Sequence, residues 1–400
     1  MRVYVIATGV RIAPFDDPVS EMPIGDATLG QTQARLFEKF GLTRVAIGSV
    51  DEIDRSEDCV VTYDDVYFTR RVLKDFLKRW DRRAVVRLAL PTDSTFYDRF
   101  SWYQDVEVID GLAMYRFFGL PANGGALDEA APLAVVYEER RVELRVPDFV
   151  NEEGRWVHPI TSSVCLHVRH WVHVLDANRL SIQVKWVDEI VARPWLAAWF
   201  LVKAALFRRG SWLWRVLSAS NRYGRDVDVH PTARIEGSFL ADGVRVGAQA
   251  LVRGSIIGPG AVLEDRCNVA YSTIGADCFV SKYTLIYNSA VMARTNAGMS
   301  MQMCLAGKRA ALTPRATPTD TLGGQAIKVR VGDAFVPVPH DVLGSCFGHD
   351  TFVGPDVFVA PGRALPNGLK LYPAPGRVLS KIPDGIDPSR PYVVRDGTLE

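Results

Sequence analysis

The stretch RVGAQALVRGSIIGPGAVLEDRCNVAYSTIGADCFV, residues 245–280, places an aliphatic residue at about every sixth position. The series is Val246, Val252, Ile257, Leu263, Val269, Ile274 and Val280, and it continues to Ile286 and Met292. It slips by one residue at Ile257 and at Ile274. A helix would show a period of 3.6 and an antiparallel sheet a period of two, so neither fits. Three short strands per turn, each sending one aliphatic side chain to a shared axis, account for the spacing. The sequence therefore predicts a left-handed parallel β-helix of six-residue repeats.

The limits of this β-helix follow from where the spacing holds. Upstream, Val229 and Ile235 keep it, and three glycines that each follow a repeat residue are expected at corners that need a permissive backbone: Gly247, Gly258 and Gly275. The spacing is lost at about 298–343 and returns at Val353, Val359, Leu365 and Leu371. We expect a β-helix at 227–375 with an insertion at about 298–343, followed by an extended tail at 376–400. A Gly-rich β-sandwich is the alternative.

The first half of the chain alternates strand-like and helix-like segments. Strands are expected at 2–7, 44–47, 60–62 and 85–90, and helices at 32–40 and 68–80, where Phe68, Val72, Phe76 and Trp80 lie four apart. This alternation predicts an α/β domain at 1–185 with a parallel sheet and crossover helices.

The totals exclude several classes of protein. With 400 residues, 48% hydrophobic and 23% charged, the chain is long enough for two domains with full cores. A net charge of +1 gives no electrostatic case for nucleic acid. The six cysteines form no C-x-x-C pair, and the opening MRVYVIATGV is a buried strand rather than a signal peptide. A cytoplasmic location is expected.

Ligands of such sheets bind at the carboxyl ends of the strands, and two features lie there. The turn Ala7-Thr8-Gly9-Val10-Arg11 brings backbone N–H groups and one cation toward an anion, so Gly9 and Arg11 are candidate phosphate-binding residues. Asp64 and Asp65 follow the third strand, and Asp65 is a candidate ligand of Mg²⁺. An Asp at this position is more commonly a cap or turn residue.

Together the two halves resemble the bifunctional sugar-1-phosphate nucleotidyltransferases that carry an N-acetyltransferase half. The N-terminal turn is similar to that family's Gly-rich signature ending in Arg, VVTYDDVYF at 60–68 resembles the strand with its metal-binding Asp, and Leu175-Asp176-Ala177-Asn178-Arg179 resembles its Leu-Leu-Glu-Ala-Asn element. The resemblance implies Mg²⁺-dependent transfer between a nucleoside triphosphate and a sugar phosphate, with Arg11 binding phosphate and Asp65 the metal. It also implies a homotrimer, and acetyl-CoA as the donor of a β-helix acyltransferase.

The chain departs from that family at both active sites. Glu21 stands where the family has a phosphate-binding lysine, and Ala270 stands where it has a histidine. His340 and His349 flank the return into the β-helix and are candidate acyl-transfer bases, of which His349 is the one chosen, unless both are surface-loop histidines without a catalytic role. Three hypotheses follow: a divergent nucleotidyltransferase, an acyl- or acetyltransferase, and a non-catalytic trimeric scaffold or sensor of sugar nucleotides.

Two further segments each allow two interpretations. His167, His170 and His173 lie three apart, so two of them would share a helix face and hold a metal, unless they are packed with Trp171 as hydrogen-bonded histidines. Residues 186–226 form a helical linker rich in Trp and Arg. Its part at 186–218 interleaves five tryptophans with Arg193, Lys203, Arg208, Arg209 and Arg215. It is expected to link the domains and cap the β-helix, or to lie in the plane of a membrane surface as a peripheral contact.

Overall fold

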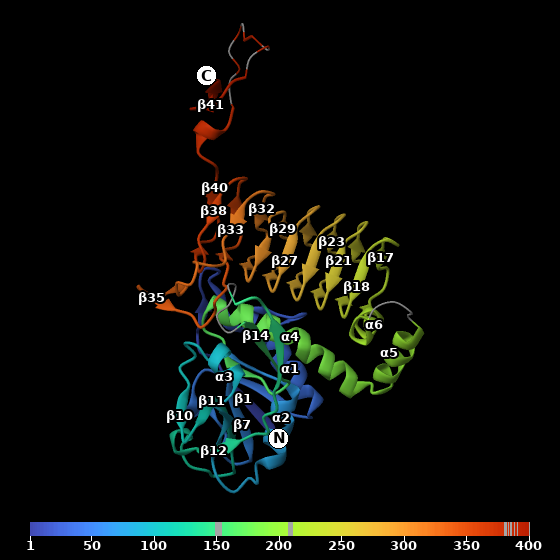
Figure 1. Cartoon of the computed structure of the whole chain (residues 1–400). Coiled ribbons are helices and arrows are strands. Elements are labelled where there is room, and N and C mark those ends of the chain that lie inside the picture. The colour runs from blue at the N-terminus through green and yellow to red at the C-terminus, as the bar shows by residue number, and fades with distance from the viewer. Residues whose placement is uncertain are drawn as a thin grey trace.

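The first half of the chain folds around a seven-stranded sheet in the computed structural model, which describes residues 1–148, 154–206, 211–379, 382, 384, 386–387, 389 and 391–399 (Figure 1). The order is β12-β9-β11-β7-β1-β6, with β10 beside β11. The bounds are β1 Arg2–Ile6, β6 Thr43–Ile47, β7 Cys59–Tyr63, β9 Val86–Pro91, β10 Glu107–Ile109, β11 Leu112–Leu120 and β12 Ala131–Ala134. The four predicted strands are confirmed.

The sheet is mixed: the four predicted strands run in one direction, as predicted for a parallel sheet, but β11 runs against them. Strand β11 runs antiparallel to both β7 and β9, whereas β1 pairs in parallel with β6 and β7. The reversal begins at the turn Asp110-Gly111, where both residues have positive φ and join β10 to β11 as a hairpin. This hairpin lies in the segment where the sequence offers no motif.

Helices and short hairpins complete the α/β domain. Helix α1 (Leu29–Lys39) starts at a capping box made by Thr28 and Gln31, and α2 (Arg70–Arg79) buries Val72 and Phe76 against the sheet. Both predicted helices are confirmed. A third helix, α3, covers Thr95–Phe100. The short strands pair as β2 Arg11–Ile12 with β3 Asp17–Pro18, β4 Pro23–Ile24 with β5 Ala27–Thr28, β8 Val66–Phe68 with β15 Cys165–His167, and β13 Arg140–Arg145 with β14 Arg155–Ile160.

Helix α4 (Trp171–Ala192) lies between the α/β domain and the second half of the chain (Figure 1). All of its first ten residues except Arg179 are buried, including the polar His173, Asp176 and Asn178, which indicates packing partners on several sides. It contacts β4 on one side and strands β25 (Thr273–Ile274) and β28 (Ala290–Val291) on the other. The helix therefore connects the two cores.

The second half is a coil of stacked parallel strands that form three faces. The first face holds β16 Arg222–Tyr223, β19 Phe239–Leu240, β22 Ile256–Ile257, β25, β28, β31 Leu305–Ala306, β36 Cys346–Phe347 and β39 Ala364–Leu365. The second holds β17 Asp228–Val229, β20 Arg245–Val246, β23 Val262–Leu263, β26 Phe279–Val280, β29 Asn296–Ala297, β32 Ala311–Leu312, β37 Phe352–Val353 and β40 Lys370–Leu371. The third holds β18 Arg234–Glu236, β21 Leu251–Arg253, β24 Asn268–Ala270, β27 Leu285–Tyr287 and β30 Met301–Gln302. This arrangement fits the predicted left-handed parallel β-helix.

The length of one coil explains the slips in the sequence repeat. Asp228 pairs with Arg245 and Arg245 with Val262, so one coil takes 17 residues, one fewer than three six-residue repeats. The aliphatic residues Val252, Val269 and Ile286 pack together along the axis, as predicted. Met292 is the exception: Val291 lies in the axis instead, and Met292 packs with the core of the α/β domain.

The repeat glycines are needed for a reason other than the predicted one. Gly247, Gly258 and Gly275 have ordinary negative φ, but a Cβ at Gly258 or Gly275 would lie 2.7 or 2.5 Å from backbone of the next coil. Many corner positions with positive φ are taken by other residues, such as Gln249 and Arg266. These three glycines therefore serve the close approach of neighbouring coils.

The β-helix continues past residue 298, so the predicted start of the insertion was wrong. Strands β30, β31 and β32 keep the parallel stacking, and β33 (Thr317–Pro318) pairs with β38 (Phe358–Val359). The six-residue pattern is lost here because the coil from Ala297 to Leu312 takes only 15 residues, and because Ala297 and Ala306 lie in the axis. The excursion itself lies between β33 and β36 and contains the hairpin of β34 (Lys328–Val331) and β35 (Ala334–Pro337).

Two helices lie at the first coil, and the tail leaves the last one (Figure 1). They are α5 (Trp195–Leu206) and α6 (Trp212–Ala219), and Leu217 in α6 accepts a hydrogen bond from the backbone N–H of Gly237 at 2.8 Å. Of the linker cations, Arg208 and Arg209 lie outside the described residues. In the described part of the chain, no helix has both the length and the apolarity needed to cross a bilayer.

Candidate functional site

The predicted phosphate turn at the end of β1 is closed by Asp64. Its Oδ1 accepts hydrogen bonds from the backbone N–H of Thr8 at 2.9 Å and from the Thr8 hydroxyl at 2.6 Å. Gly9 has a φ of +68° and open space around it. Arg11 is exposed and directed to its own hairpin, where it pairs with Asp16 at 2.7 Å. Gly9 and Arg11 are accessible, but Asp64 brings a negative charge into the turn.

Asp65 is held by two arginines that the sequence reasoning did not identify. Its side chain is 0% exposed, its Oδ2 contacts the guanidinium of Arg116, and Arg169 approaches the same oxygen at 3.5 Å. Arg116 also lies over the ring of Tyr63, 4.9 Å from its centre. Burial raises the pKa of Asp65, and the two guanidinium groups oppose that shift. We call Asp65, Arg116 and Arg169 the arginine–aspartate triad.

This triad does not fit the Mg²⁺ that the resemblance implies. A magnesium ligand must offer a carboxylate oxygen to the ion and its waters, but Oδ2 of Asp65 faces guanidinium groups and Oδ1 is buried with no hydrogen-bond partner. Asp64, the neighbouring carboxylate, is engaged with Thr8. No cluster of three or more His, Cys, Asp or Glu suited to a metal occurs within the described ranges.

The three histidines near α4 are not brought together as ligands. His167 Nδ1 lies 2.8 Å from the carbonyl of Gln104, and its Nε2 accepts from the N–H of Arg116 at 3.0 Å. His173 accepts from the N–H of Arg169 and contacts the carbonyl of Trp102 at 2.7 Å. Burial lowers the pKa of His167 to about 3 and that of His173 to about 4, so both are neutral near pH 7.

His170 follows the same pattern at the start of α4. Its Nδ1 accepts from the N–H of Val172 as a helix cap, and its Nε2 lies 3.1 Å from the carbonyl of Arg330 in β34. Its ring packs against both Trp171 and Trp102. All three rings therefore use both nitrogens on the protein itself, which favours the hydrogen-bonded interpretation over metal binding.

His349 lies at the seam between the α/β domain and the β-helix. Its Nδ1 accepts from the backbone N–H of Lys308 at 2.8 Å, which leaves the proton on Nε2, 3.1 Å from Asp17. Asp17 also pairs with the Lys308 ammonium at 2.6 Å. Burial opposes ionisation of Asp17, but Lys308 and His349 outweigh it and lower its pKa. Since both ring nitrogens are used, His349 offers no free lone pair to an acyl acceptor.

His340 is also engaged between the two halves of the chain. Its Nε2 lies 3.2 Å from Asp176 in α4, and Asp176 pairs with Arg179 at 2.9 Å. Nearby, Asn178 accepts from the Thr273 hydroxyl in β25 at 2.9 Å. These buried polar contacts fix α4 to both the excursion and the β-helix. Glu21 is exposed and Ala270 is buried, so neither supplies the group that the resembled family has there.

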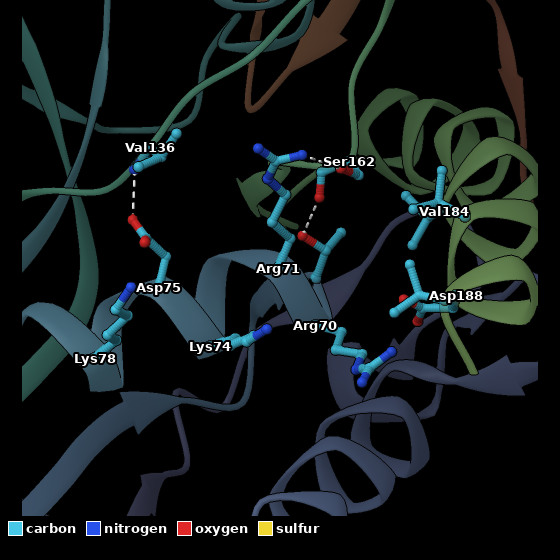
Figure 2. A pocket seen from close by; sticks show the side chains of 12 residues that line it. Arg70, Arg71, Lys74, Asp75, Lys78, Val136, Ser162, Val184 and Asp188 are labelled. Carbon is cyan, nitrogen blue, oxygen red and sulfur yellow. Dashed lines mark hydrogen bonds between the residues drawn. The ribbon is translucent and has the colours of Figure 1, made fainter. Parts of the chain in front are cut away.

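An open pocket of about 360 Å³ lies between α2 and α4, away from the predicted sites (Figure 2). Helix α2 lines it with the cations Arg70, Arg71, Lys74 and Lys78, and α4 forms the facing wall with Val184, Val187, Asp188 and Val191. Figure 2 shows these two helices on opposite sides, with Ser162 above Arg71 and Val136 above Asp75. We call it the cationic pocket.

The charges of the cationic pocket are not balanced within it. Arg70 has two buried guanidinium nitrogens, Nε and Nη1, without a hydrogen-bond partner, and neither Lys74 nor Lys78 has an ion pair among the described residues. Asp75 is taken up by Arg79 at 2.9 Å and by the N–H of Val136 at 2.6 Å. Burial raises the pKa of Asp188, and the charges of Lys39 and Arg70 oppose that shift. The sequence could have predicted this row of cations, because Arg70, Lys74 and Lys78 lie four apart on the polar face of a predicted helix.

The fold and these surfaces define a class: a two-domain protein with an α/β domain on a parallel β-helix, with the α4 helix between them. No family model matches the chain, and no curated protein matches it. Among solved structures it is similar to a mutant of GDP-perosamine N-acetyl transferase from Caulobacter crescentus in complex with CoA and GDP-perosamine. The identity is 20% and the TM-score 0.15, over 38% of this chain and 53% of that chain, so this chain spans about half of its neighbour's length. A similarity at this level assigns neither activity nor ligand to the chain.

Proposed function

We propose that this protein is a non-catalytic scaffold, in which a nucleotidyltransferase-like domain and a β-helix are kept as a rigid pair. The observation that carries the proposal is the arginine–aspartate triad. Where the resembled family places a metal beside its Asp, this chain places the guanidinium of Arg116 against Asp65. An internal cation there neutralises the carboxylate permanently and needs no phosphate ligand to complete it.

The seam between the domains supports the same proposal. Asp17, Lys308 and His349 join the first loops of the α/β domain to the β-helix, and Asn367 donates to the carbonyl of Phe15 at 2.8 Å. Each candidate base at the seam is thus used to hold the domains together. A nucleotidyl or acyl transfer site would need these groups to face substrate instead.

Ligand-induced heat stability and pyrophosphate exchange test the proposal. The full chain is incubated with nucleoside triphosphates and sugar 1-phosphates with and without Mg²⁺, and separately with acetyl-CoA. The expected results are no Mg²⁺-dependent shift, no exchange of pyrophosphate into triphosphate, and no shift with acetyl-CoA.

Two outcomes would overturn it. Exchange that needs Mg²⁺ and disappears in Asp65→Asn, but not in the exposed control Asp54→Asn, would establish nucleotidyl transfer. A shift with acetyl-CoA that disappears in His349→Ala would establish acyl transfer. Light scattering in the same samples measures whether the scaffold is the homotrimer that the resemblance implies.

A further inference from the structure

Helix α5 carries an apolar stripe that no described residue covers. The stripe is Trp195, Trp199, Val202 and Leu206, spaced by four, three and four residues, which places them on one face. Each is at least half exposed, from 50% for Trp199 to 76% for Leu206. We call these four residues the α5 stripe. A helix on the surface of a globular protein normally turns polar residues outward, whereas α5 turns apolar residues outward.

The opposite face of α5 already provides its packing. Leu196, Phe200 and Ala204 are buried, and the ring of Phe200 meets that of Trp186 in α4 at 5.8 Å. The helix is therefore held by three residues at four-residue spacing, and the α5 stripe is not needed for folding. Only a partner other than the described residues can remove the α5 stripe from water.

Lys203 on α5 and Arg215 on α6 are the cations next to these helices' tryptophans, and neither α5 nor α6 contains an acidic residue. The Lys203 ammonium lies 5.3 Å from the ring of Trp199, and Arg215 lies over Trp212 while it donates to the last carbonyls of α5. Tryptophan beside Lys or Arg is the composition that suits the boundary between headgroups and acyl chains.

The cationic pocket adjoins this surface through the last turns of α4. Val187 and Val191 line the pocket, and Val191 is 57% exposed only four residues before Trp195. On the pocket's other wall, Lys74 and Lys78 have no ion pair among the described residues, and Arg70 interacts electrostatically with Asp188 without forming an ion pair. The end of α4 thus connects the cationic pocket to the α5 stripe along the chain.

From these observations we propose that α5, the end of α4 and the cationic pocket together dock on a bilayer of anionic phospholipid. The α5 stripe enters the boundary of the acyl chains, and the pocket takes a lipid phosphate. A helix of 12 residues is about 18 Å long, too short for the ~30 Å hydrocarbon core, so α5 lies in the plane of the surface.

A bilayer fits this surface better than a second copy of the chain. In a two-fold contact the same patch faces itself, so the cations of both pockets would meet one another. A bilayer with negative headgroups instead supplies the missing charge, because each Lys or Arg near such a surface is attracted to it. The inference goes beyond the scaffold function and does not use the arginine–aspartate triad.

Vesicle sedimentation with the full chain tests the proposal. Vesicles of phosphatidylcholine are compared with vesicles that also contain phosphatidylglycerol, with tryptophan emission as a second readout. We expect binding to the anionic vesicles with a blue shift, and binding at least about tenfold weaker to phosphatidylcholine alone. The double variant Trp195→Ser/Leu206→Ser and the double variant Lys74→Glu/Lys78→Glu should each weaken binding at least about tenfold.

The control is Phe358→Ser/Lys370→Glu, an exposed apolar residue and an exposed cation on the far coils of the β-helix, and it should bind like the wild type. Equal binding of wild type to both vesicle types, or unchanged binding of Trp195→Ser/Leu206→Ser, would overturn the inference. So would full competition by soluble glycerol phosphate, which would make the pocket a site for a free ligand. A dimer in light scattering that is lost in the stripe variant would assign the stripe to a second copy. None of these results depends on catalysis, so a failure of this proposal can be distinguished from a failure of the scaffold proposal.

Discussion

Replacing Arg116 by methionine should destabilise the α/β domain strongly, because it leaves the buried carboxylate of Asp65 with only Arg169. Asp65 is 0% exposed, and Arg169 approaches it at 3.5 Å and is shared with Asp105 at 3.0 Å. Breaking a buried ion pair by removing one partner costs about 3–5 kcal/mol. Since Arg116 is itself 20% exposed and Arg169 remains, we expect the lower end, about 3 kcal/mol.

The free energy of unfolding is measured by urea titration with circular dichroism, and a double-mutant cycle isolates the pair. Asp65→Leu alone should also destabilise, but Asp65→Leu/Arg116→Met should be less destabilised than the sum of the two single variants, by at least about 1 kcal/mol. The control is Arg2→Met, which removes the exposed pair with Asp54 and should cost far less than Arg116→Met. A loss for Arg116→Met no larger than for Arg2→Met, or strict additivity in the cycle, would refute the triad as a buried neutralising unit.

Three further predictions concern pH, the β-helix axis and assembly. Burial lowers the folded-state pKa of His167 to about 3 and of His173 to about 4, below the ordinary 6.5, so their neutral forms stabilise the fold above pH 6.5. As pH falls from 6.5 toward 4 these two histidines bind up to two more protons in the unfolded chain than in the folded one, so their joint contribution to the free energy of unfolding should fall by up to about 2.7 kcal/mol per pH unit, measured by urea titration at several pH values. His173→Gln should flatten this slope, and a profile without a slope would contradict the assignment. Ile286→Ala should lower the free energy of unfolding by about 2–5 kcal/mol, because Ile286 fills the axis of the β-helix. The control Leu285→Ala, at its partly exposed neighbour, should lower it far less. Equal losses for the two variants would contradict the placement of Ile286 in the axis. Light scattering should give three times the mass of one chain if the resemblance holds for assembly, and a monomer would reject that prediction.

The sequence predicted the β-helix because its axis is encoded locally. Val252, Val269 and Ile286 each pack on the same position one coil away, so the spacing alone identifies them. The signal failed where the coil shortened and the axis accepted Ala297 and Ala306, since a small residue in a narrow coil does not stand out from its neighbours. Met292 was misassigned for a related reason, because its burial comes from the α/β domain rather than from the axis.

The candidate site was less predictable because its decisive contacts join distant parts of the chain. Asp65 was recognised from its place after β7, but Arg116 lies 51 residues away on β11, the strand whose direction the alternation of elements did not reveal. The contact of Asp17 with Lys308 and His349 depends on how the two domains dock, which no local pattern encodes. The cations of the cationic pocket, in contrast, lie on the polar face of one predicted helix and were visible in the sequence, whereas its facing wall on α4 was not.

The stacking of the β-helix also sets a fixed distance. The first two faces each stack eight strands, and parallel strands lie about 4.8 Å apart, so the coil separates its two ends by roughly 34 Å. Helices α5 and α6 lie at one end, and the C-terminal tail departs from the other (Figure 1). The coil therefore acts as a rigid spacer, and inserting or deleting one 17-residue turn would change its reach by about 4.8 Å while leaving the direction of the rod unchanged.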